Sequence, residues 1–536
     1  MQAPREIELK LSCDESGLAL LARHPLLQAG AEAEPLALRA TYYDTRARDL
    51  ARAGLSLRVR REDARTLQTV KGASASAGLS DRPEWEGPIE GPGPDLAALA
   101  GTPAAAVLAG AEAPDLAPLY ATAVERTVRP VRYGAAAIAV TLDTGRIEAD
   151  GASAPVCEVE LELTEGSPAD LFALAQALAE TIPLRLGVLS KSERGEALLA
   201  GAHDRPSKAE RIVLDEGATA GEALVRIVRG GLRHLRLNEA VLLETRDPEA
   251  LHQVRVALRR LRSALTLYKP ILAGDATAQR LRETVKRVTE PFGAARNLDV
   301  YLDETLPAER AQRPAELAQP ADEAALDALR TRTRAERDTA YDAVIATLDG
   351  AEWRGLLIDL LAWAEAGPWR SAAGPEGGPA PRDRPAAAFA ARVLKRLRRR
   401  VKRQGRGLAK LDPEARHRVR IEAKKLRYGA EFFGSLFPDR KARKRHKAFV
   451  AALADLQDHL GALNDLATAH GLAATLAAHL PEDLAAPPGP EEPATAAPAL
   501  FAAGLTAADA DARAVDRLAG AEAAHAALVD LHPFWR

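Results

Sequence analysis

The stretch Glu158-Val159-Glu160-Leu161-Glu162-Leu163 alternates strictly between acidic and apolar residues. Because successive side chains of a β-strand point to opposite faces, this alternation predicts a strand with one carboxylate face and one apolar face. Glu6-Ile7-Glu8-Leu9-Lys10 repeats the pattern near the start of the chain, and Leu57-Arg58-Val59-Arg60 shows it with guanidinium groups in place of carboxylates. Residues 1–200 therefore predict amphipathic strands whose charged faces are segregated by sign.

Charge segregation of this kind favours a binding site over a solvated surface. A solvated sheet face usually mixes signs to form cross-strand ion pairs, although such a face stays the alternative for any single strand. Carboxylate oxygens suit hard divalent cations such as Mg²⁺ or Mn²⁺. Planar guanidinium groups bind phosphoryl oxygens through paired hydrogen bonds. The two sets of side chains together predict a site for a metal-bound polyphosphate.

These motifs resemble those of the CYTH superfamily, the triphosphate tunnel metalloenzymes, whose ExExK signature matches Glu6 to Lys10. The resemblance covers almost all of residues 1–200, in the family's order. It continues through Tyr42-Tyr43-Asp44-Thr45, Leu57-Arg58-Val59-Arg60, Val70-Lys71-Gly72, Arg82-Pro83-Glu84-Trp85-Glu86, Arg126, Leu142-Asp143-Thr144-Gly145, Glu158 to Glu162 and Ser190-Lys191. It implies a closed antiparallel β-barrel that forms a tunnel with a charged lumen and has flanking helices.

The resemblance also implies roles for individual residues. Family members hydrolyse triphosphates or cyclise ATP, and the residues expected to cradle the phosphates are Lys10, Arg58, Arg60, Lys71, Arg126 and Lys191. The residues expected to hold Mg²⁺ or Mn²⁺ are Glu6, Glu8, Asp143, Glu158, Glu160 and Glu162. Glu6, Glu8 and Glu84 are counted with the six basic residues as the catalytic set. Whether Glu84 or Glu86 faces the lumen stays open, because both share one strand face.

The second half of the chain contains an internal repeat in a predominantly helical sequence. Leu251 to Arg262 matches Arg416 to Arg427 at an offset of 165 residues, which predicts two bundle halves related by approximate two-fold symmetry. On a helix, His252, Arg255, Arg259 and Arg262 fall within an arc of roughly 80° and form one basic stripe. A related Gly-containing turn is expected downstream of each copy, at residues 292–299 and 460–465.

This repeat resembles the CHAD (conserved histidine α-helical) domain, whose members bind inorganic polyphosphate on a basic surface. Stripes of cations without i,i+4 acidic partners repel one another, so a polyanion is the natural compensator. The residues expected to bind polyphosphate are Arg226, Arg229, Arg233, His252, Arg255, Arg259, Arg262, His417, Arg420, Lys424 and Arg427. Nucleic acid is disfavoured as the partner, because single-strand binders use aromatic residues for stacking and few accompany these stripes.

Composition supports a multidomain α+β protein. The chain has 536 residues with a formal net charge of −2, yet residues 392–447 carry 22 basic and 5 acidic residues. Its two cysteines, Cys13 and Cys157, lie far apart in the sequence, which argues against a disulfide framework or a cysteine zinc cluster. The expected organisation is a CYTH-like domain over 1–200, a linker over 201–215, a CHAD-like domain over 216–480, a Pro-rich linker over 481–498 and a helical segment over 499–536. Neither a membrane-spanning helix nor a signal peptide is expected.

The sequence thus predicts an enzyme that hydrolyses a triphosphate, foremost inorganic triphosphate, in a metal-dependent tunnel. Polyphosphate binding is expected from the basic helical domain. Three alternatives remain: a non-catalytic polyphosphate-binding or targeting protein, an adenylate-cyclase activity and a thiamine-triphosphatase activity. We expect a cytoplasmic location, with association with polyphosphate granules as an open question, and the sequence leaves the oligomeric state undetermined.

Overall fold

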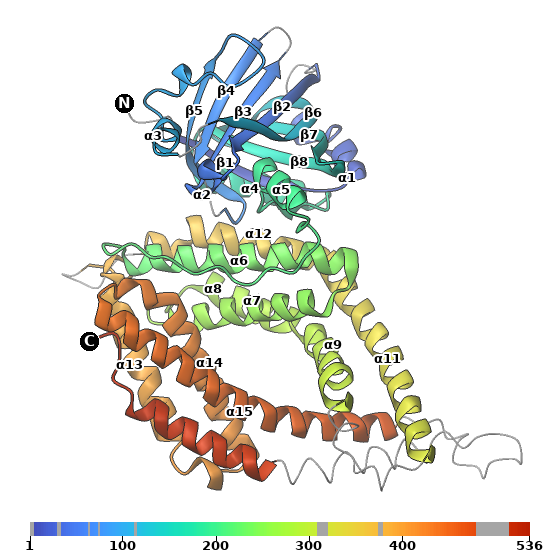
Figure 1. The fold of residues 1–536 in the computed structure, drawn as a ribbon, viewed down its shortest axis with the longest axis vertical. Helices are drawn as coiled ribbons and strands as arrows, with labels where there is room; N and C mark the ends of the chain where they lie inside the picture. The colour runs from blue at the N-terminus through green and yellow to red at the C-terminus, as the bar shows by residue number, and fades with distance from the viewer. Residues whose placement is uncertain are drawn as a thin grey trace, which may run out of the picture. The chain divides into compact units, whose positions relative to one another are not determined.

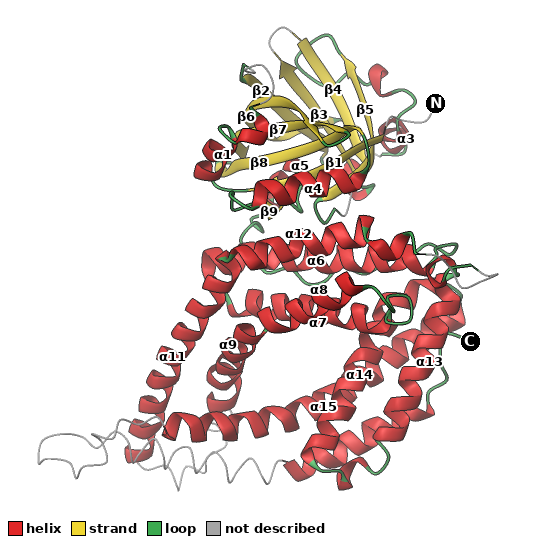
Figure 2. Ribbon diagram, turned by 180° about the vertical axis from the view of Figure 1, so that it is seen from behind, coloured by secondary structure: helices red, strands yellow, loops and turns green. Residues whose placement is uncertain are grey.

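The computed structural model describes residues 5–28, 34–62, 65–72, 76–111, 115–307, 320–372, 379–478 and 514–536 (Figure 1). All of its strands lie before residue 187, and the described chain beyond that point is helical with connecting loops, as the colouring of Figure 2 shows. This arrangement confirms the predicted α+β class, with a barrel followed by a helical region.

The strands form one antiparallel sheet that closes on itself. Its order is β5-β4-β3-β2-β6-β7-β8-β1, and β1 pairs with β5 to complete the ring, while the short β9 adds to β1. The strands are β1 (Arg5–Ser12), β2 (Leu36–Thr45), β3 (Leu55–Glu62), β4 (Arg65–Gly72), β5 (Leu79–Pro88), β6 (Leu116–Tyr133), β7 (Ala136–Ala149), β8 (Ala152–Glu165) and β9 (Arg185–Leu186). Full closure leaves no exposed edge along this ring.

Strand register places the charged faces inside the barrel. Lys10 of β1 lies opposite Glu160 of β8, and Asp143 of β7 lies opposite both Glu158 and Arg126 of the strands beside it. The other face of β8 carries Val159 and Leu161, each with 0% of its surface exposed. Because side chains alternate along a strand, one register therefore sends carboxylates into the lumen and aliphatic groups into the core outside it.

The Asp143-Thr144-Gly145 sequence is typical of a turn that closes a strand. In the structure, however, β7 continues through it to Ala149. A Cβ atom at position 145 would lie 2.1 Å from the carbonyl oxygen of Ala123 on β6. The glycine is therefore needed for the close approach of two paired strands, rather than for a chain reversal.

The helices associated with the barrel fall in the first of two compact units. This unit comprises residues 1–209 together with 228–254 and 348–368, so it includes most of one long helix and all of another from the second half of the chain. Its helices are α1 (Glu15–Leu21), α2 (Asp49–Arg52), α3 (Pro103–Ala109), α4 (Pro168–Ala179), α5 (Lys191–Leu199), most of α6 (Ala220–Thr245) and α12 (Ala351–Ala366). The buried face of α4, which includes Leu171 and Leu174, packs near β8 and β1.

The second compact unit is helical and contains the internal repeat. Its helices are α7 (Pro248–Leu267, from residue 255), α8 (Ala276–Val288), α9 (Glu290–Val300), α11 (Pro320–Asp349, to residue 347), α13 (Ala386–Gln404), α14 (Pro413–Phe433) and α15 (Arg440–Ala478). The two equivalent helices of the repeat, α7 and α14, contact each other. Arg260 Nη1 lies 2.6 Å from Glu431 Oε2, and the rings of Tyr268 and Phe433 are 6.1 Å apart.

The two Gly-containing segments downstream of these helices are not turns. Residues 292–299 lie within α9, and residues 460–465 lie within α15. A glycine is tolerated in a helix interior at a cost of about 1 kcal/mol, so its presence alone does not end a helix.

Of the expected linkers, residues 201–219 contain no helix or strand apart from a single bridge at Thr219. The Pro-rich segment 481–498 lies outside the described residues, as do residues 499–513, and residues 514–530 are helical. Among the helices that the structure describes, none combines the length and apolar character needed to cross a membrane.

Candidate functional site

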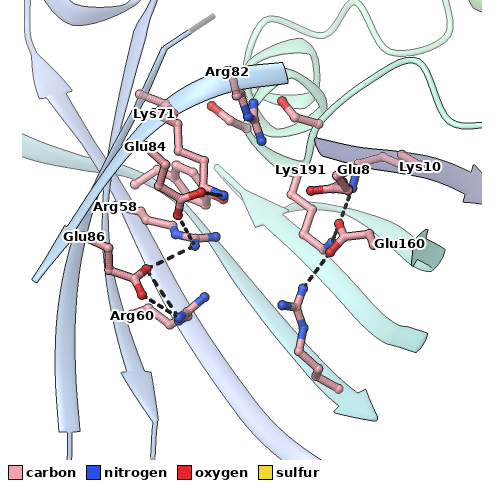
Figure 3. Close-up of a pocket in the computed structure, with 15 residues that line it drawn as sticks. Glu8, Lys10, Arg58, Arg60, Lys71, Arg82, Glu84, Glu86, Glu160 and Lys191 are labelled. Atoms are coloured by element: carbon pink, nitrogen blue, oxygen red, sulfur yellow. Dashed lines mark hydrogen bonds and ion pairs between the residues drawn. The ribbon is translucent and has the colours of Figure 1, made fainter. Parts of the chain in front are cut away.

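The barrel encloses a cavity of about 210 Å³ lined by charged side chains. Two groups of residues face each other across it (Figure 3). Lys71, Glu84, Arg58, Glu86 and Arg60 lie on one side, and Glu8, Lys10, Glu160 and Lys191 lie on the other. Of the predicted phosphate-binding residues, all six line this cavity: Lys10, Arg58, Arg60, Lys71, Arg126 and Lys191.

Three carboxylates converge in the barrel, and one of them, Glu160, lines this cavity. Asp143, Glu158 and Glu160 each offer an oxygen atom within 4.8 Å of the others. Asp143 is fully buried and Glu158 is 3% exposed. Such a set of clustered carboxylate oxygens is chemically suited to a hard divalent cation.

Three basic side chains, those of Lys191, Lys10 and Arg126, compensate the negative charge of these carboxylates. Lys191 Nζ lies 2.7 Å from Asp143 Oδ2, 2.6 Å from Glu158 Oε2 and 3.1 Å from Glu160 Oε1. Lys10 Nζ also contacts Glu158 and Glu160. Arg126 donates to both oxygens of Asp143, at 2.8 and 2.6 Å, and to Glu160 at 3.0 Å. The buried charges are therefore paired, as a low-dielectric interior requires.

This compensation sets the protonation state of the acids. Burial would raise the pKa of Glu158, but Lys10 and Lys191 lower it to about 2. Burial would also raise the pKa of Glu160, but the charges of Lys10 and Lys191 lower it. Both acids are thus ionised at neutral pH and available as ligands.

Two further carboxylates, Glu162 of β8 and Glu8 of β1, differ from this cluster in their electrostatic surroundings. The two residues lie opposite each other on β8 and β1. Burial, followed by the charges of Glu8 and Glu84, raises the pKa of Glu162. Glu8 Oε1 is buried and has no hydrogen-bond partner among the described residues, although Lys10 Nζ lies 3.4 Å away. Glu6 pairs with Arg82 in the backbone register, but its side chain lies outside the described part of the structure.

The opposite side of the lumen is built from β3, β4 and β5. Lys71 Nζ lies 2.6 Å from Glu84 Oε2, and Arg58 Nη2 lies 3.8 Å from Glu84 and 3.7 Å from Glu86. Arg60 Nη2 lies 3.4 Å from Glu86 Oε2. Glu84 and Glu86 both line the cavity, which answers the question of direction that the sequence left open.

Sequence reasoning missed several residues of this site. Arg82, Ser56, Tyr42, Ser190 and Ser192 also line the cavity. Arg82 shares the strand face of Glu84 and Glu86, so the period of two could have identified it. Tyr42 stacks on Tyr120 with ring centroids 4.7 Å apart, and it also borders the lumen.

A second candidate site is a groove of the helical unit. Six basic and two acidic side chains line it, together with Thr284, Thr289 and Gly293: Arg255, Arg259, Arg262, Arg280, Lys286 and Arg287, with Glu283 and Glu290. The first three belong to the predicted stripe on α7, and the next three come from α8, which the sequence analysis did not select. Positions 280 and 287 are seven residues apart, so they lie on one side of α8 and could have been identified from their spacing.

Electrostatic crowding marks this groove. Burial lowers the pKa of Arg255 to about 10, and Arg259, Arg296 and Arg420 contribute in the same direction. Arg420 belongs to the second copy of the repeat, so the two predicted stripes come close to each other. Arg255 Nη1 donates to the carbonyl oxygens of Phe292 and Gly293, and Arg259 Nε is buried without a hydrogen-bond partner among the described residues.

Other predicted polyphosphate ligands lie elsewhere or have protein partners. Arg226 is exposed on α6, Arg229 forms an ion pair with Glu365, and Arg233 pairs with Glu193. On α14, Arg427 Nε lies 2.9 Å from Glu431 Oε1. His252 is half-buried and Lys424 is likewise partly exposed, whereas His417 is exposed. These residues do not line the groove, so their role in binding stays a prediction.

We expect acid to weaken the barrel through Glu158. Its pKa is about 2 in the fold, compared with 4.5 ordinarily, so the unfolded chain takes up a proton at higher pH than the folded chain. The stability from this group is complete above pH 4.5 and is lost as the pH falls towards 2. In metal-free protein, the free energy of unfolding from urea titrations should fall across this window.

The variant Glu158→Gln should reduce this pH dependence, whereas Glu165→Gln, at an exposed position of the same strand, should not. Equal pH dependence in both variants would contradict the assignment.

Comparison with known proteins supports both halves of this description. The CYTH domain model matches residues 4–195, and the CHAD domain model matches residues 226–474. An inorganic triphosphatase from Haemophilus influenzae is 34% identical over 200 residues, which cover 36% of this chain and 55% of that protein. The chain therefore spans about half the length of this curated relative.

Two solved structures also align with parts of the chain. The CHAD domain from the plant Ricinus communis is 29% identical with a TM-score of 0.49, over 60% of this chain and 97% of that one. A Hippeastrum protein, described as having a dominant triphosphatase activity, is 22% identical with a TM-score of 0.28, over 36% of this chain and 95% of that one. On the two matches to domain models, this chain contains a CYTH domain at residues 4–195, followed by a CHAD domain at residues 226–474.

Proposed function

We propose that the barrel hydrolyses a triphosphate, foremost inorganic triphosphate, with Mg²⁺ or Mn²⁺ bound at Asp143, Glu158 and Glu160. The observation that carries this proposal is the convergence of these three carboxylates, together with the fact that Glu160 lines the lumen cavity alongside six basic residues. The relative named as an inorganic triphosphatase supports it. A pure polyanion binder would have no need of buried carboxylates, because they repel the ligand.

The donor set fits a divalent cation. Its members are carboxylate oxygens, which Mg²⁺ and Mn²⁺ prefer. The lowered pKa values of Glu158 and Glu160 keep these two side chains deprotonated at neutral pH. The buried oxygen of Glu8, which lacks a hydrogen-bond partner among the described residues, offers a further acceptor beside them. A bound ion would polarise a phosphoryl oxygen and favour deprotonation of water.

The protein's own contribution is charge neutralisation and positioning. Hydrolysis of a phosphoanhydride requires the charge on the phosphoryl oxygens to be balanced and the attacking water to be aligned with the leaving group. Arg58, Arg60 and Lys71 would hold the phosphates from one wall of the lumen, and Lys10, Arg126 and Lys191 from the other. In the structure these cations are paired with lumen carboxylates, so a bound triphosphate would exchange one set of anionic partners for another.

We also propose that the groove between α7 and α8 binds inorganic polyphosphate. Burial, followed by repulsion from neighbouring arginines, lowers the pKa of Arg255. A linear polyanion bound in the groove would relieve that repulsion. Arg420, from the second copy of the repeat, contributes to the lowered pKa of Arg255 without lining the groove itself. Such binding would also bring the protein to polyphosphate granules.

The metal proposal predicts loss of hydrolysis on a single isosteric change. Glu160→Gln removes one anionic ligand while keeping the size of the side chain, so kcat for inorganic triphosphate should fall at least a hundredfold, or by roughly 2.7 kcal/mol. Phosphate release at saturating Mg²⁺ or Mn²⁺ is the measurement, with Glu165→Gln as the control on the same strand. Near wild-type turnover by Glu160→Gln would exclude Glu160 as a ligand.

The phosphate cradle can be tested with a charge-conserving change. A guanidinium group can bind two phosphoryl oxygens at once and an ammonium group cannot. Arg60→Lys should therefore lower kcat/KM about tenfold, or ~1.4 kcal/mol. Arg61→Lys, at the exposed neighbouring position on the other face of β3, should have little effect. If both variants behaved alike, Arg60 would not be a substrate ligand.

Polyphosphate binding predicts a strong dependence on salt and on four specific cations. A variant with four changes to Glu should no longer bind long-chain polyphosphate, as measured by fluorescence anisotropy. The changed residues are Arg255, Arg259, Arg420 and Lys424. A control variant with the same change of charge should bind polyphosphate as the wild type does. Its changes are at four residues that are exposed on the barrel unit: Arg23, Arg39, Arg132 and Arg146. Wild-type affinity should fall steeply with salt, because counterions are released on binding. Equal affinity for duplex DNA at physiological salt would indicate a non-specific basic surface.

A further inference from the structure

The segment that leads from β9 into α5 delivers Lys191 to the lumen, and α6 holds its backbone. Arg233 Nη1 donates to the carbonyl oxygen of Val188, and Arg236 Nε donates to that of Leu186 at 2.9 Å. Both arginines are at most 9% exposed. The CHAD match begins at residue 226, within α6, yet residues 228–245 of this helix belong to the same compact unit as the barrel.

Arg233 also contacts the first turn of α5. Glu193 forms a capping box with Ser190, because Glu193 Oε2 accepts from Ser190 N at 2.8 Å and the Ser190 hydroxyl accepts from Glu193 N at 3.2 Å. The other oxygen, Glu193 Oε1, accepts from Arg233 Nη2 at 2.6 Å. One carboxylate therefore connects α6 to the capping residue that immediately precedes Lys191.

Lys191 needs such support because its position is electrostatically unfavourable. It is the first residue of α5, where the helix dipole and the free N–H groups disfavour a cation. Its charge is balanced by Asp143 and Glu158 in the lumen. A fixed N-cap directs the side chain towards those carboxylates and limits the alternatives open to a long, flexible lysine.

The same region holds Lys10. The amide of Gly187 donates to Lys10 O at 2.9 Å, and a Cβ atom at position 187 would lie 2.6 Å from Lys10 Cγ. Arg233 Nη1 also lies 3.4 Å from the carbonyl oxygen of Ser76. Two residues further along the chain, the carbonyl oxygen of Gly78 accepts a hydrogen bond from Lys10 N at 2.9 Å. The guanidinium of Arg233 thus contacts both backbone segments that flank Lys10.

We propose that Arg233 is a positioning residue of the triphosphate tunnel, which acts through Glu193 and the 186–190 backbone to place Lys191. This proposal rests on the proposed function of the lumen. It gives Arg233 a role different from the polyphosphate contact that its place in the basic sequence pattern suggests. A helix assigned to the CHAD domain would thereby complete the phosphate site of the CYTH domain.

A double-mutant cycle in the full-length protein tests the proposal. Arg233→Met should lower kcat/KM for inorganic triphosphate about tenfold, because a small displacement of a binding group has a large effect on rate. Lys191→Met should lower it about a hundredfold. If Arg233 acts through Lys191, the double variant should match Lys191→Met alone. Glu193→Gln should show a smaller loss with the same lack of additivity, and serves as the second variant if Arg233→Met fails to fold.

The controls separate positioning from general destabilisation. Arg260→Met removes another buried arginine ion pair, to Glu431 at 2.6 Å, and should leave triphosphate hydrolysis unchanged. Thermal unfolding of each variant reports on the fold independently. Additive losses, or full activity in Arg233→Met when Lys191→Met is inactive, would overturn the positioning role and leave the proposed function intact. Full activity in Lys191→Met would overturn both.

Discussion

The structure of the barrel depends on charge compensation in its lumen. Glu158 and Glu160 are brought side by side by the period of the strand, and Asp143 is added by the register of β7. Three carboxylates in a buried space would repel each other and take up protons if no cations faced them. Lys10, Lys191 and Arg126 supply those cations from three different elements. The result is a cluster of mostly buried carboxylates whose charges are compensated by side chains of the same domain.

The helical unit shows the opposite balance. Cations from α7 and α8 gather in its groove with few acids to offset them, and burial together with mutual repulsion lowers the pKa of Arg255. A surface of this kind costs folding free energy unless an anion binds it. The charges of the lumen are therefore compensated by other side chains of the protein. The positive charge of the groove is instead suited to compensation by a bound anion.

Arg229, Arg233 and Arg236 illustrate why a basic sequence pattern does not establish a binding surface. Their spacing on α6 resembles that of the stripes on α7 and α14, and all three are arginines. In the structure Arg229 pairs with Glu365, while Arg233 and Arg236 bond backbone carbonyls next to the barrel. Arginine suits this task because its planar group offers five donors in fixed directions.

The sequence by itself determined the strands around Glu6–Lys10, Leu57–Arg60 and Glu158–Leu163 and their charged faces, because a period of two residues is set locally by backbone geometry. The domain order followed from the resemblance of its motifs to two families. The sequence identified the ExExK and alternating Glu motifs, and the CYTH and CHAD matches confirm what those motifs indicated. Only the tertiary structure decided that Glu84 and Glu86 both face the lumen, that α8 contributes to the basic groove and that β7 continues through Gly145. It also decided that Arg233 of α6 meets Glu193 of α5. These outcomes depend on contacts between residues far apart in the chain, and such contacts are set by packing and register, which local periodicity does not specify.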